Sequence, residues 1–553
     1  RIIFTYTVAN LLLAERPMHS YFKNHTLAAG ALLLTLTGIA SRILGFFYRI
    51  FLSRTIGAEG LGVYQMVFPI YGICFSICAG SIQTAISRFT AADRDRAGRT
   101  LFAGFIISFS LALGLAAVII RFSGFLASQV LMEPRCAPLL PAMALAIPCT
   151  SVHACLCGWY YGKEKVQVPA LSQMVEQCIR IFTVFLIARI WEEQGRPVTV
   201  LAAVAGLVAG EAGSALFTLL SFLLFGSRKK DGPSVSGRPA PSSVLTAAAP
   251  LLAMALPLMG NRLVMNLLQS LEAILIPVRL ELSGLSRSQA LSVYGVLTGM
   301  ALPFVMFPSA IINSLAVVLL PSVARHQSLG NRSGILKNIA LSFRYSAYMG
   351  ILCIGIFTSF GDSLGLQVFK SAEAGSFISI LAWLCPFLYL STTMGSVLNG
   401  LGKTSVTFLH NLVSLLVRLA FVFFGIPRAG IRACLWGMLA GELVLSLLHL
   451  YSLRRLVRYA PNAWAVIVKP SFCLASALGI FSLFPDPLPL PGSLPTHDPE
   501  LAAGRRPCDG AAAGPAPHRR PPHAHHRGAG CADALQGAGD LGSGRCVLRT
   551  ERN

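Results

Sequence analysis

Apolar residues occur in long runs along most of this chain, separated by short loops that contain charged residues, glycine or proline. Between Leu27 and Phe484 we count thirteen runs long enough to cross the roughly 30 Å of hydrocarbon in a bilayer. Because lipid leaves no water to pair with open strand edges, these segments are predicted to be helices. The predicted spans begin at Leu27, Leu61, Leu101, Ala137, Leu171, Thr199, Val244, Leu291, Leu341, Phe377, Ser405, Ile431 and Trp464.

The two halves of the apolar region repeat each other. Residues 49–64 (RIFLSRTIGAEGLGVY) match residues 279–294 (RLELSGLSRSQALSVY) without a gap, and GLVAGE, ending at Glu211, matches GMLAGE, ending at Glu442. A third match places Pro148, Gly162, Lys165, Val168, Val175 and Arg180 on Pro386, Gly400, Lys403, Val406, Val413 and Arg418. The order predicts two parallel six-helix lobes, spans one to six and seven to twelve. Such repeats place a substrate site between them, near the bilayer midplane.

Composition excludes a water-soluble protein. Of 553 residues, 54% are hydrophobic and 12% are charged, whereas roughly a quarter of the residues of a soluble domain are charged. The net charge of +22 comes from Lys and Arg in short loops, and no basic patch with aromatic residues suggests nucleic acid as a partner. With the N-terminus in the cytoplasm, the cytoplasmic loops hold seventeen of these basic residues and the opposite loops eight. This asymmetry predicts a multi-pass protein of a bacterial plasma membrane.

The domain boundaries follow from the spans and from composition. Residues 485–553 are rich in Pro, Gly, Ala, Arg and His, which predicts a disordered tail. The tail also looks like an out-of-frame translation of GC-rich DNA. We expect an N-terminal extension (1–26), a first lobe (27–226), a cytoplasmic linker (227–243), a second lobe (244–452), a thirteenth span (453–484) and the tail (485–553).

The sequence contains no recognisable set of catalytic or metal-binding residues. Eleven of the fourteen cysteines lie in or beside apolar segments, where buried free thiols are expected. There is no GxxxxGK[ST] phosphate loop and no HExxH or GxSxG motif. We therefore predict that the chain is not an enzyme, with no cofactor other than a possible coupling ion, H⁺ or Na⁺.

Cations in the first span of each half are the candidate substrate-binding residues, because an ionisable group at the bilayer centre is costly. Arg42 and Arg49 are seven residues apart, on one helix face. Arginine holds phosphate oxygens in a bidentate fork, which suits a phosphate-bearing ligand. An alternative for Arg49 and Arg279, and also for the deeper Arg42 and Arg262, is that they extend to the lipid headgroups. The predicted substrate-binding set is Arg42, Arg49, Arg262, Asn266, Gln269 and Arg279.

Further charges inside the spans form a candidate coupling network. Glu176 and Arg180 have the i, i+4 spacing of an ion pair, whereas span eleven has Arg418 without an acid, so Arg418 must find its partner elsewhere. Glu211 and Glu442 are candidates for binding a proton or sodium, and a plain hydrogen bond to a neighbouring helix is the alternative. The predicted network is Glu176, Arg180, Glu211, Glu272, Arg418 and Glu442.

The segment SRILGFFYRIFLSRTIGAEGLGVYQMVFPIY, residues 41–71, resembles the opening of the family of stage V sporulation protein B and related polysaccharide biosynthesis proteins. That family belongs to the superfamily of multidrug, oligosaccharidyl-lipid and polysaccharide exporters. The resemblance implies a V-shaped bundle of two six-helix lobes with one or two extra helices. It also implies flipping of undecaprenyl-linked saccharides, lipid II included. Similar lipid II flippases have an SRxxGxxRD motif: Arg42 and Gly45 match it, and Arg49 falls one residue after the second arginine, followed by Ile50.

Three functions remain open at this point. A lipid-linked saccharide flippase that works by alternating access is favoured by the arginines of the first spans. A cation-coupled exporter of the multidrug and toxin extrusion type shares the architecture but favours acids in its cavity. A non-transporting scaffold for cell-wall or spore-cortex synthesis is the third. For the flippase we expect a lipid-linked saccharide and membrane lipids as partners, and function as a monomer.

Overall fold

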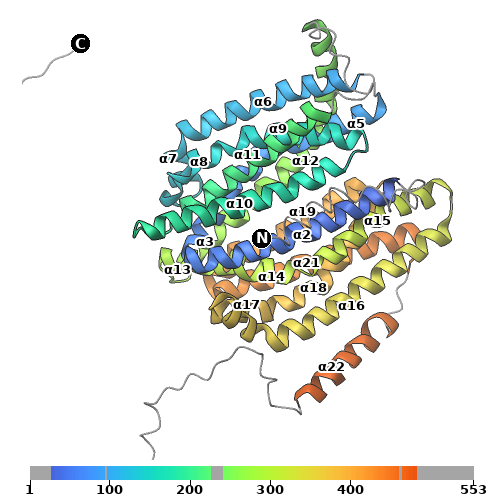
Figure 1. The fold of residues 1–553 in the computed structure, drawn as a ribbon. Coiled ribbons are helices and arrows are strands. Elements are labelled where there is room, and N and C mark those ends of the chain that lie inside the picture. Colours follow the sequence, from blue (N-terminus) through green and yellow to red (C-terminus); the bar gives the residue numbers. More distant parts are fainter. Residues whose placement is uncertain (1–25, 94–95, 226–240, 460–463, 483–553) are drawn as a thin grey trace, which may run out of the picture. The chain divides into compact units, whose positions relative to one another are not determined.

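The computed structural model describes residues 26–93, 96–225, 241–459 and 464–482, and these residues form helices joined by short turns (Figure 1). Thirteen of the described helices are long and apolar enough to cross a membrane. The predicted helical, multi-pass architecture is confirmed. The predicted N-terminal extension (1–26, all but Thr26), most of the linker (227–243) and the tail (485–553) lie outside the described residues.

The first half begins with a 30-residue helix, α2 (Thr26–Thr55). The second predicted span consists of α3, α4, a π-helical turn η1 and α5, which run without a loop from Gly57 to Ala92. The bounds of these four elements are α3 (Gly57–Gln65), α4 (Phe68–Phe75), η1 (Ser76–Gly80) and α5 (Ser81–Ala92). They are followed by α6 (Ala97–Arg121), α7 (Ser123–Phe125), η2 (Leu126–Val130), η3 (Pro134–Cys136), α8 (Leu139–Ala144), α9 (Ala146–Gly162), α10 (Gln167–Glu193) and α11 (Val200–Phe225).

The second half begins with a 42-residue helix, α12 (Pro241–Leu282). It continues with α13 (Arg287–Gly295), η4 (Val296–Ala301), α14 (Leu302–Met306), α15 (Ser309–Ser328), α16 (Arg332–Leu364), η5 (Gly365–Phe369), α17 (Ala372–Leu381), η6 (Ala382–Leu384), α18 (Cys385–Gly400), α19 (Thr404–Ala420), η7 (Phe421–Gly425), α20 (Ile426–Ala429) and α21 (Ile431–Val457). Beyond it lie η8 (Trp464–Val468) and α22 (Lys469–Ser482), which pack against α16.

The set of thirteen long helices differs from the predicted set at two places. The span predicted from Leu291 is two helices, Arg287–Met306 and Ser309–Ser328, which follow one another from the end where α3 lies to the opposite end (Figure 1). Pro308 lies in the turn that precedes α15, and proline interrupts a helix because it has no N–H to donate. The segment predicted from Trp464 is η8 and α22, which are not among the thirteen.

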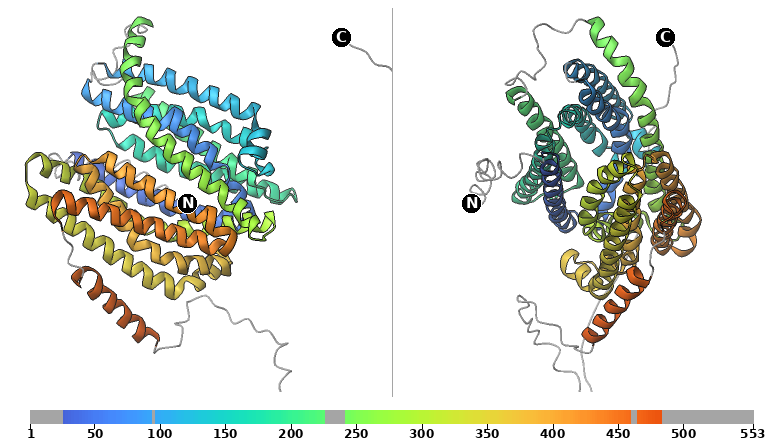
Figure 2. Two further views of the ribbon diagram at one scale, coloured as in Figure 1. Left: turned by 180° about the vertical axis from the view of Figure 1, so that it is seen from behind. Right: turned by 90° about the vertical axis from the view of Figure 1, so that its right-hand side faces the viewer.

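The first helix of each half packs against the other half. In Figures 1 and 2, α5–α11 (blue to green) form one group and α14–α21 (yellow to orange) another. Helix α2 packs against α10 of its own half and α15 of the second, whereas α12 packs against α4, α5 and α6 of the first half and α19 of its own. Repeated helices therefore occupy equivalent places, as two parallel repeats require.

The central hydrophobic core, in which α3 meets α13, joins the two halves at one end. We call the end with residues 93 and 96 and with loops 163–166, 329–331 and 401–403 the basic end, and the end with residues 122–138, 194–199, 283–286 and 370–371 the far end. The central cluster contains Leu61 and Tyr64 of α3 together with Leu291 and Tyr294 of α13. Near the basic end, one cluster lies within the second half and the other joins helices of the first half to α12. The described halves are thus closed against each other at the far end.

Close backbone packing of α3 on α13 makes this closure tight. A Cβ on Gly62 would lie 2.1 Å from the carbonyl oxygen of Leu291, and a Cβ on Gly295 would lie 1.9 Å from that of Ala58. Because real Cβ atoms do not approach backbone so closely, both positions require glycine in this arrangement.

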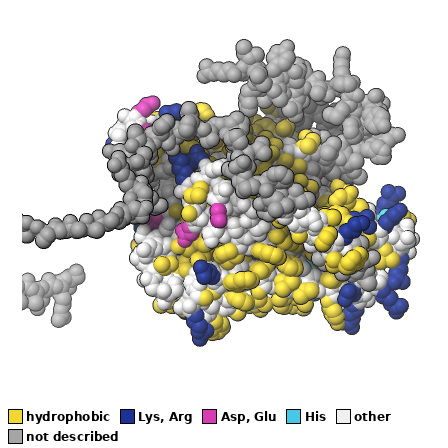
Figure 3. All heavy atoms as spheres, turned by 90° about the horizontal axis from the view of Figure 1, so that it is seen from below, with side chains coloured by type: hydrophobic (Ala, Val, Ile, Leu, Met, Phe, Trp, Pro, Cys, Tyr) yellow, Lys and Arg dark blue, Asp and Glu magenta, His cyan; other side chains and the backbone are white. Residues whose placement is uncertain are grey.

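The outer surface of the bundle is apolar. Phe182, Leu223, Phe424 and Phe472 each expose more than 60% of their surface. On the face drawn in Figure 3, hydrophobic side chains cover the middle, and Lys and Arg gather mainly at the right-hand end. A continuous apolar surface of this kind is stable against lipid rather than water.

Candidate substrate site between the two halves

Arg42 and Arg49 of α2 line one cavity, as their spacing predicts. The cavity has a volume of about 330 Å³. Arg42 Nη1 donates to Ser309 Oγ at 3.1 Å, and Arg49 Nη1 donates to the carbonyl oxygen of Thr298 at 3.3 Å. Both arginines therefore reach from the first half to the second. The lining residues are Ser41, Arg42, Gly45, Phe46, Arg49, Gln177, Pro303, Met306 and Phe307.

The polar residues of α12 do not join Arg42 in this cavity. Arg262 Nη2 donates to Thr84 Oγ1 of α5 at 3.2 Å, and a Cβ on Gly80 would lie 2.2 Å from its Nη1. Asn266 Nδ2 donates to Ser76 Oγ at 2.5 Å. The structure thus places Arg262 and Asn266 against the first half.

Gln269 and Arg279, the other two predicted residues of α12, lie elsewhere. Gln269 is exposed. Arg279 Cζ lies 3.7 Å from the centre of the Phe423 ring, in a cation–π contact. Neither residue lines the cavity of Arg42 and Arg49.

The first half contains a buried network of two carboxylates and one guanidinium. Glu176 and Arg180 form the predicted i, i+4 ion pair, and Arg180 Nη2 lies 3.8 Å from Glu211 Oε1. Tyr71 donates to Glu211 Oε1 at 2.9 Å, and Thr150 donates to its Oε2 at 3.0 Å. The sequence analysis did not identify Tyr71 or Thr150, because a lone hydroxyl in an apolar run has no signature.

This network opens onto a second cavity of about 420 Å³. Glu176, Glu211 and His153 line it, together with Asn266 of α12. Two acids and one arginine leave one negative charge in excess, which a proton or a monovalent cation can neutralise. The other lining residues are Tyr71, Gly72, Phe75, Gln83, Thr150, Ala154, Cys157, Tyr161, Pro169 and Gln173.

The second half has the same charge count in a different arrangement. The partner of Arg418 is Glu272 of α12, at 2.8 Å from Nη2 and 2.9 Å from Nε. Glu442 accepts a hydrogen bond from Ser391 at 3.0 Å. In both halves a glycine precedes the acid: a Cβ on Gly210 would lie 3.2 Å from Arg180 Cβ, and one on Gly441 2.5 Å from Arg418 Cγ. The repeated Ala-Gly-Glu therefore makes room for the arginine.

The repeat register explains why the two halves differ in charge. Glu176 of α10 corresponds to Ser414 of α19, whereas Arg42 of α2 corresponds to Glu272 of α12. In the first half the acid that pairs with the arginine is on the fifth span, α10. In the second half it is on the first span, α12. Arg42 has no acid within ion-pair distance among the described residues, so its charge is available to an anionic ligand.

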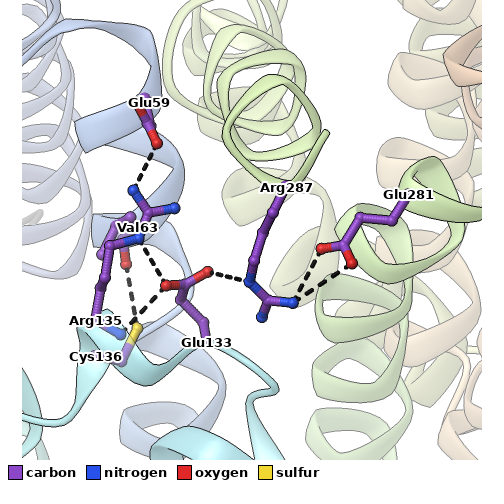
Figure 4. A network of polar contacts seen from close by, with 7 residues as sticks. All are labelled: Glu59, Val63, Glu133, Arg135, Cys136, Glu281 and Arg287. Carbon is purple, nitrogen blue, oxygen red and sulfur yellow. Dashed lines mark hydrogen bonds and ion pairs between the residues drawn. The ribbon is translucent and has the colours of Figure 1, made fainter. Parts of the chain in front are cut away.

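An ion-pair network closes the far end across the two halves (Figure 4). Glu133, whose side chain is 1% exposed, pairs with Arg135 at 2.8 Å and with Arg287 of the second half at 3.0 Å. Arg135 also pairs with Glu59 at 2.5 Å, and Arg287 with Glu281 at 3.1 Å. We call these five residues the far-end latch. The sequence analysis missed it because its members come from four separate segments.

Arg135 keeps its positive charge in the far-end latch over the accessible pH range. The hydrogen bond between Arg135 and Glu133 raises the pKa of the Arg135 guanidinium above its usual value. A base whose pKa rises on folding stabilises the fold below its unfolded pKa, which for arginine exceeds 12. Next to it, burial raises the pKa of the Cys136 thiol to about 12, so this thiol is unreactive while the latch is closed.

Among the described residues, no group of three or more His, Cys, Asp or Glu side chains is placed to hold a metal ion.

Comparisons with known proteins identify what the chain resembles. A family model described as polysaccharide biosynthesis protein matches residues 27–327. Stage V sporulation protein B of Bacillus subtilis (strain 168) is 26% identical over 431 residues, which cover 77% of this chain and 83% of that protein. Lipid II flippase MurJ of the same organism is 22% identical over 492 residues, 82% of this chain and 87% of that protein.

Two solved structures of transporters share the fold of this chain. Lipid II flippase MurJ in an inward closed conformation superposes with a TM-score of 0.65 at 14% identity, over 82% of this chain and 93% of that one. An inward-facing multidrug resistance transporter of the MATE family gives 0.60 at 14% identity, over 77% and 98%. At such identities the likeness shows the fold alone.

Proposed function

Because this chain belongs to the polysaccharide biosynthesis protein family, we propose that it is a flippase that carries a lipid-linked saccharide across the membrane and catalyses no covalent step. The similar proteins include one named for the flipping of lipid II and one named for sporulation. The proposed substrate is an undecaprenyl-linked saccharide such as lipid II, and the protein works as a monomer in a bacterial plasma membrane.

The observation that carries this proposal is the cavity between the halves that Arg42 and Arg49 line. The hydrogen bond that Arg42 makes among the described residues goes to a neutral hydroxyl, that of Ser309. A diphosphate linkage accepts paired hydrogen bonds from guanidinium groups. Arg42 therefore binds the phosphate of the carrier lipid. Arg49 lies two helical turns further along α2, on the same face of the helix.

The closed far end and the separate clusters at the basic end support alternating access. With the basic loops on the cytoplasmic side, the headgroup enters from the cytoplasm and binds at α2. Opening of the far-end latch and separation of α3 from α13 then release it on the other side. Arg262 and Asn266 contact α5 and η1, so they change surroundings when the halves rock.

A coupling ion, H⁺ or Na⁺, is proposed for the carboxylate networks. In the first half Arg180 pairs with Glu176, and in the second half Arg418 pairs with Glu272. Glu211 and Glu442, the remaining acids of the two networks, are therefore the groups that take up the ion.

One observation favours a cation-coupled drug exporter instead. The cavity of about 420 Å³ contains Glu176 and Glu211, and acids in a cavity attract cationic drugs. Export of a cationic dye by cells that overproduce the protein, lost in Glu211→Gln but kept in Arg42→Ala, would favour that function.

The decisive experiment measures lipid II in the outer leaflet of cells depleted of the protein. We expect the accessible precursor to fall on depletion and to recover with wild type. Arg42→Ala should recover less than about a tenth of it, because a charged hydrogen-bonded contact contributes roughly 1.5–3 kcal/mol. Arg42→Lys, which keeps the charge without the fork, should fall between.

The matched control is Arg121→Ala, at the end of α6, where the guanidinium lies over Phe122. It should behave as wild type at equal protein levels. Unchanged outer-leaflet lipid II on depletion would remove lipid II as the substrate, and full recovery with Arg42→Ala would overturn the assigned phosphate site.

A further inference from the structure

The second half contains two histidines that the transport site does not use. His410 of α19 and His449 of α21 are 7% and 1% exposed, and their ring centres lie 5.1 Å apart at 71°. Both nitrogens of His449 and Nδ1 of His410 have no hydrogen-bond partner among the described residues. His410 Nε2 lies 3.3 Å from Ser452 Oγ.

Buried ring nitrogens without hydrogen-bond partners destabilise a fold, so their presence here calls for an explanation. A neutral imidazole carries one donor and one acceptor, and each buried polar atom left unpaired destabilises the fold. The first half shows the satisfied alternative: His153 lies 2.9 Å from Ser172 Oγ through Nε2 and 3.4 Å from Ser214 Oγ through Nδ1. In the repeat, Ser172 corresponds to His410, so a second histidine stands where the first half has a hydroxyl.

Among the described residues, no hydrogen bond or ion pair links the two rings to a charged group on a neighbouring helix. From α18 they meet Gly395, where a Cβ would lie 3.6 Å from His449 Cε1. On α21, Glu442 is seven residues before His449 and bonds to Ser391, and Arg454 and Arg455 end the helix. On α19, Arg418 is eight residues after His410 and pairs with Glu272 of α12, and Lys403 precedes the helix.

We propose that His410 and His449 form a proton-binding site of the second half, which takes up one proton shared between the two rings. The proton comes from water at the basic end by way of Ser452, which lies five residues before the end of α21 and contacts His410. It joins the two rings through an N–H⁺···N hydrogen bond that satisfies two of the unpaired nitrogens. A second proton is excluded, because two positive rings this close in a low-dielectric interior repel strongly.

Proton binding would act on the transport machinery through the helices that carry the rings. A new hydrogen bond between the rings draws α19 and α21 together. Arg418 is on α19 and Glu442 is on α21, about 10–12 Å along each helix from its histidine at 1.5 Å per residue. The histidine pair thus biases the Arg418–Glu272 pair and the free acid Glu442. This consequence rests on the proposed transport function, whereas proton binding itself does not.

The test is proton uptake by the purified full-length protein in nanodiscs without substrate, after a pH jump from 8 to 5, followed with a pH indicator. Wild type should take up one more proton per protein than His449→Gln, than His410→Gln, and than the variant with both changes. Equal loss in all three is expected because the rings share one proton. Uptake that stays at the wild-type value in both single variants, or that falls by two protons in the double variant, would overturn the proposal.

Gly395→Ala is the control for altered packing, since it adds a methyl group at ordinary contact distance from His449 and keeps both rings; its uptake should equal that of wild type. If the glutamine variants fail to fold, ¹⁵N spectra of wild type with labelled histidine decide the question. A shared proton makes two rings titrate with one common midpoint, and two independent midpoints would contradict it. Because no lipid-linked saccharide is present, a negative result here leaves the flippase proposal standing, and a failed lipid II assay leaves this one standing.

Discussion

Single glycines set how closely the buried arginines approach their acids. Gly441→Ala would place a methyl group 2.5 Å from Arg418 Cγ and 2.9 Å from its Cδ. The guanidinium must then shift away from Glu272, and we expect a loss of about 1–3 kcal/mol of stability. Thermal unfolding in detergent measures it. Gly114→Ala is the control: nothing lies within 4 Å of the added Cβ, so helix propensity predicts no loss. Equal unfolding temperatures for the two variants would contradict the packing argument.

The Arg418–Glu272 pair is a second residue-scale test. The side chain of Glu272 is 6% exposed and that of Arg418 27%. Glu272→Ala leaves a mostly buried cation without a partner, so we expect a loss of about 3 kcal/mol in the free energy of unfolding. Replacing both residues with leucine should recover most of this loss, since no unpaired charge remains. A double variant as unstable as Glu272→Ala would show that the pair matters for shape rather than for charge.

At the scale of elements, the contact of α3 with α13 decides whether the far end closes. Gly62→Ala and Gly295→Ala each put a methyl group against backbone atoms, at 2.1 Å and 1.9 Å. Backbone cannot yield as a flexible side chain does, so both variants should lose more stability than Gly441→Ala. Their unfolding temperatures, compared with that of Gly72→Ala, check this; the Cβ of the control meets Asn266 Oδ1 at an ordinary 3.5 Å. A destabilisation no larger than in Gly441→Ala would argue against the tight α3–α13 contact.

At the scale of the whole molecule, the far-end latch should control the opening between the halves. Glu133→Gln removes the charge that Arg135 and Arg287 share, which weakens the tie across the halves. Cys136 reports the outcome because it is 0% exposed beside the latch and its thiol, with a pKa of about 12, is unreactive when buried. We expect a membrane-impermeant maleimide to label Cys136 several times faster in Glu133→Gln than in wild type.

Mass spectrometry of the labelled peptide identifies the site, since ten other described cysteines are also free. Asp93→Asn is the control, because it breaks an exposed ion pair with Arg96 at the basic end and should leave the labelling of Cys136 unchanged. Identical labelling rates for Glu133→Gln and wild type would show that other contacts hold the far end shut.

The sequence by itself determined the helices, their order and the repeat. In lipid every backbone group must be paired within its own segment, so the apolar runs predict helices directly, and twelve predicted spans correspond to long helices of the structure. The i, i+4 spacing likewise predicted the Glu176–Arg180 pair, since one helix carries both residues. The span predicted from Leu291, which the structure divides before α15, and the segment predicted from Trp464 both differ from the prediction in helix length. The predicted domain boundaries and the roles of the site residues stay predictions.

Only the tertiary structure decided which helices face each other. The partner of Arg418 is Glu272, 146 residues away. Arg262 of α12 bonds to Thr84 of α5 and does not lie beside Arg42. The latch across Glu133 and the His410–His449 pair are contacts of the same kind. Periodicity gives the face of a helix on which a residue lies, but in an apolar chain every face is hydrophobic enough to be buried. The choice of neighbour comes from close packing and from the pairing of buried charges, which distant parts of the chain settle together.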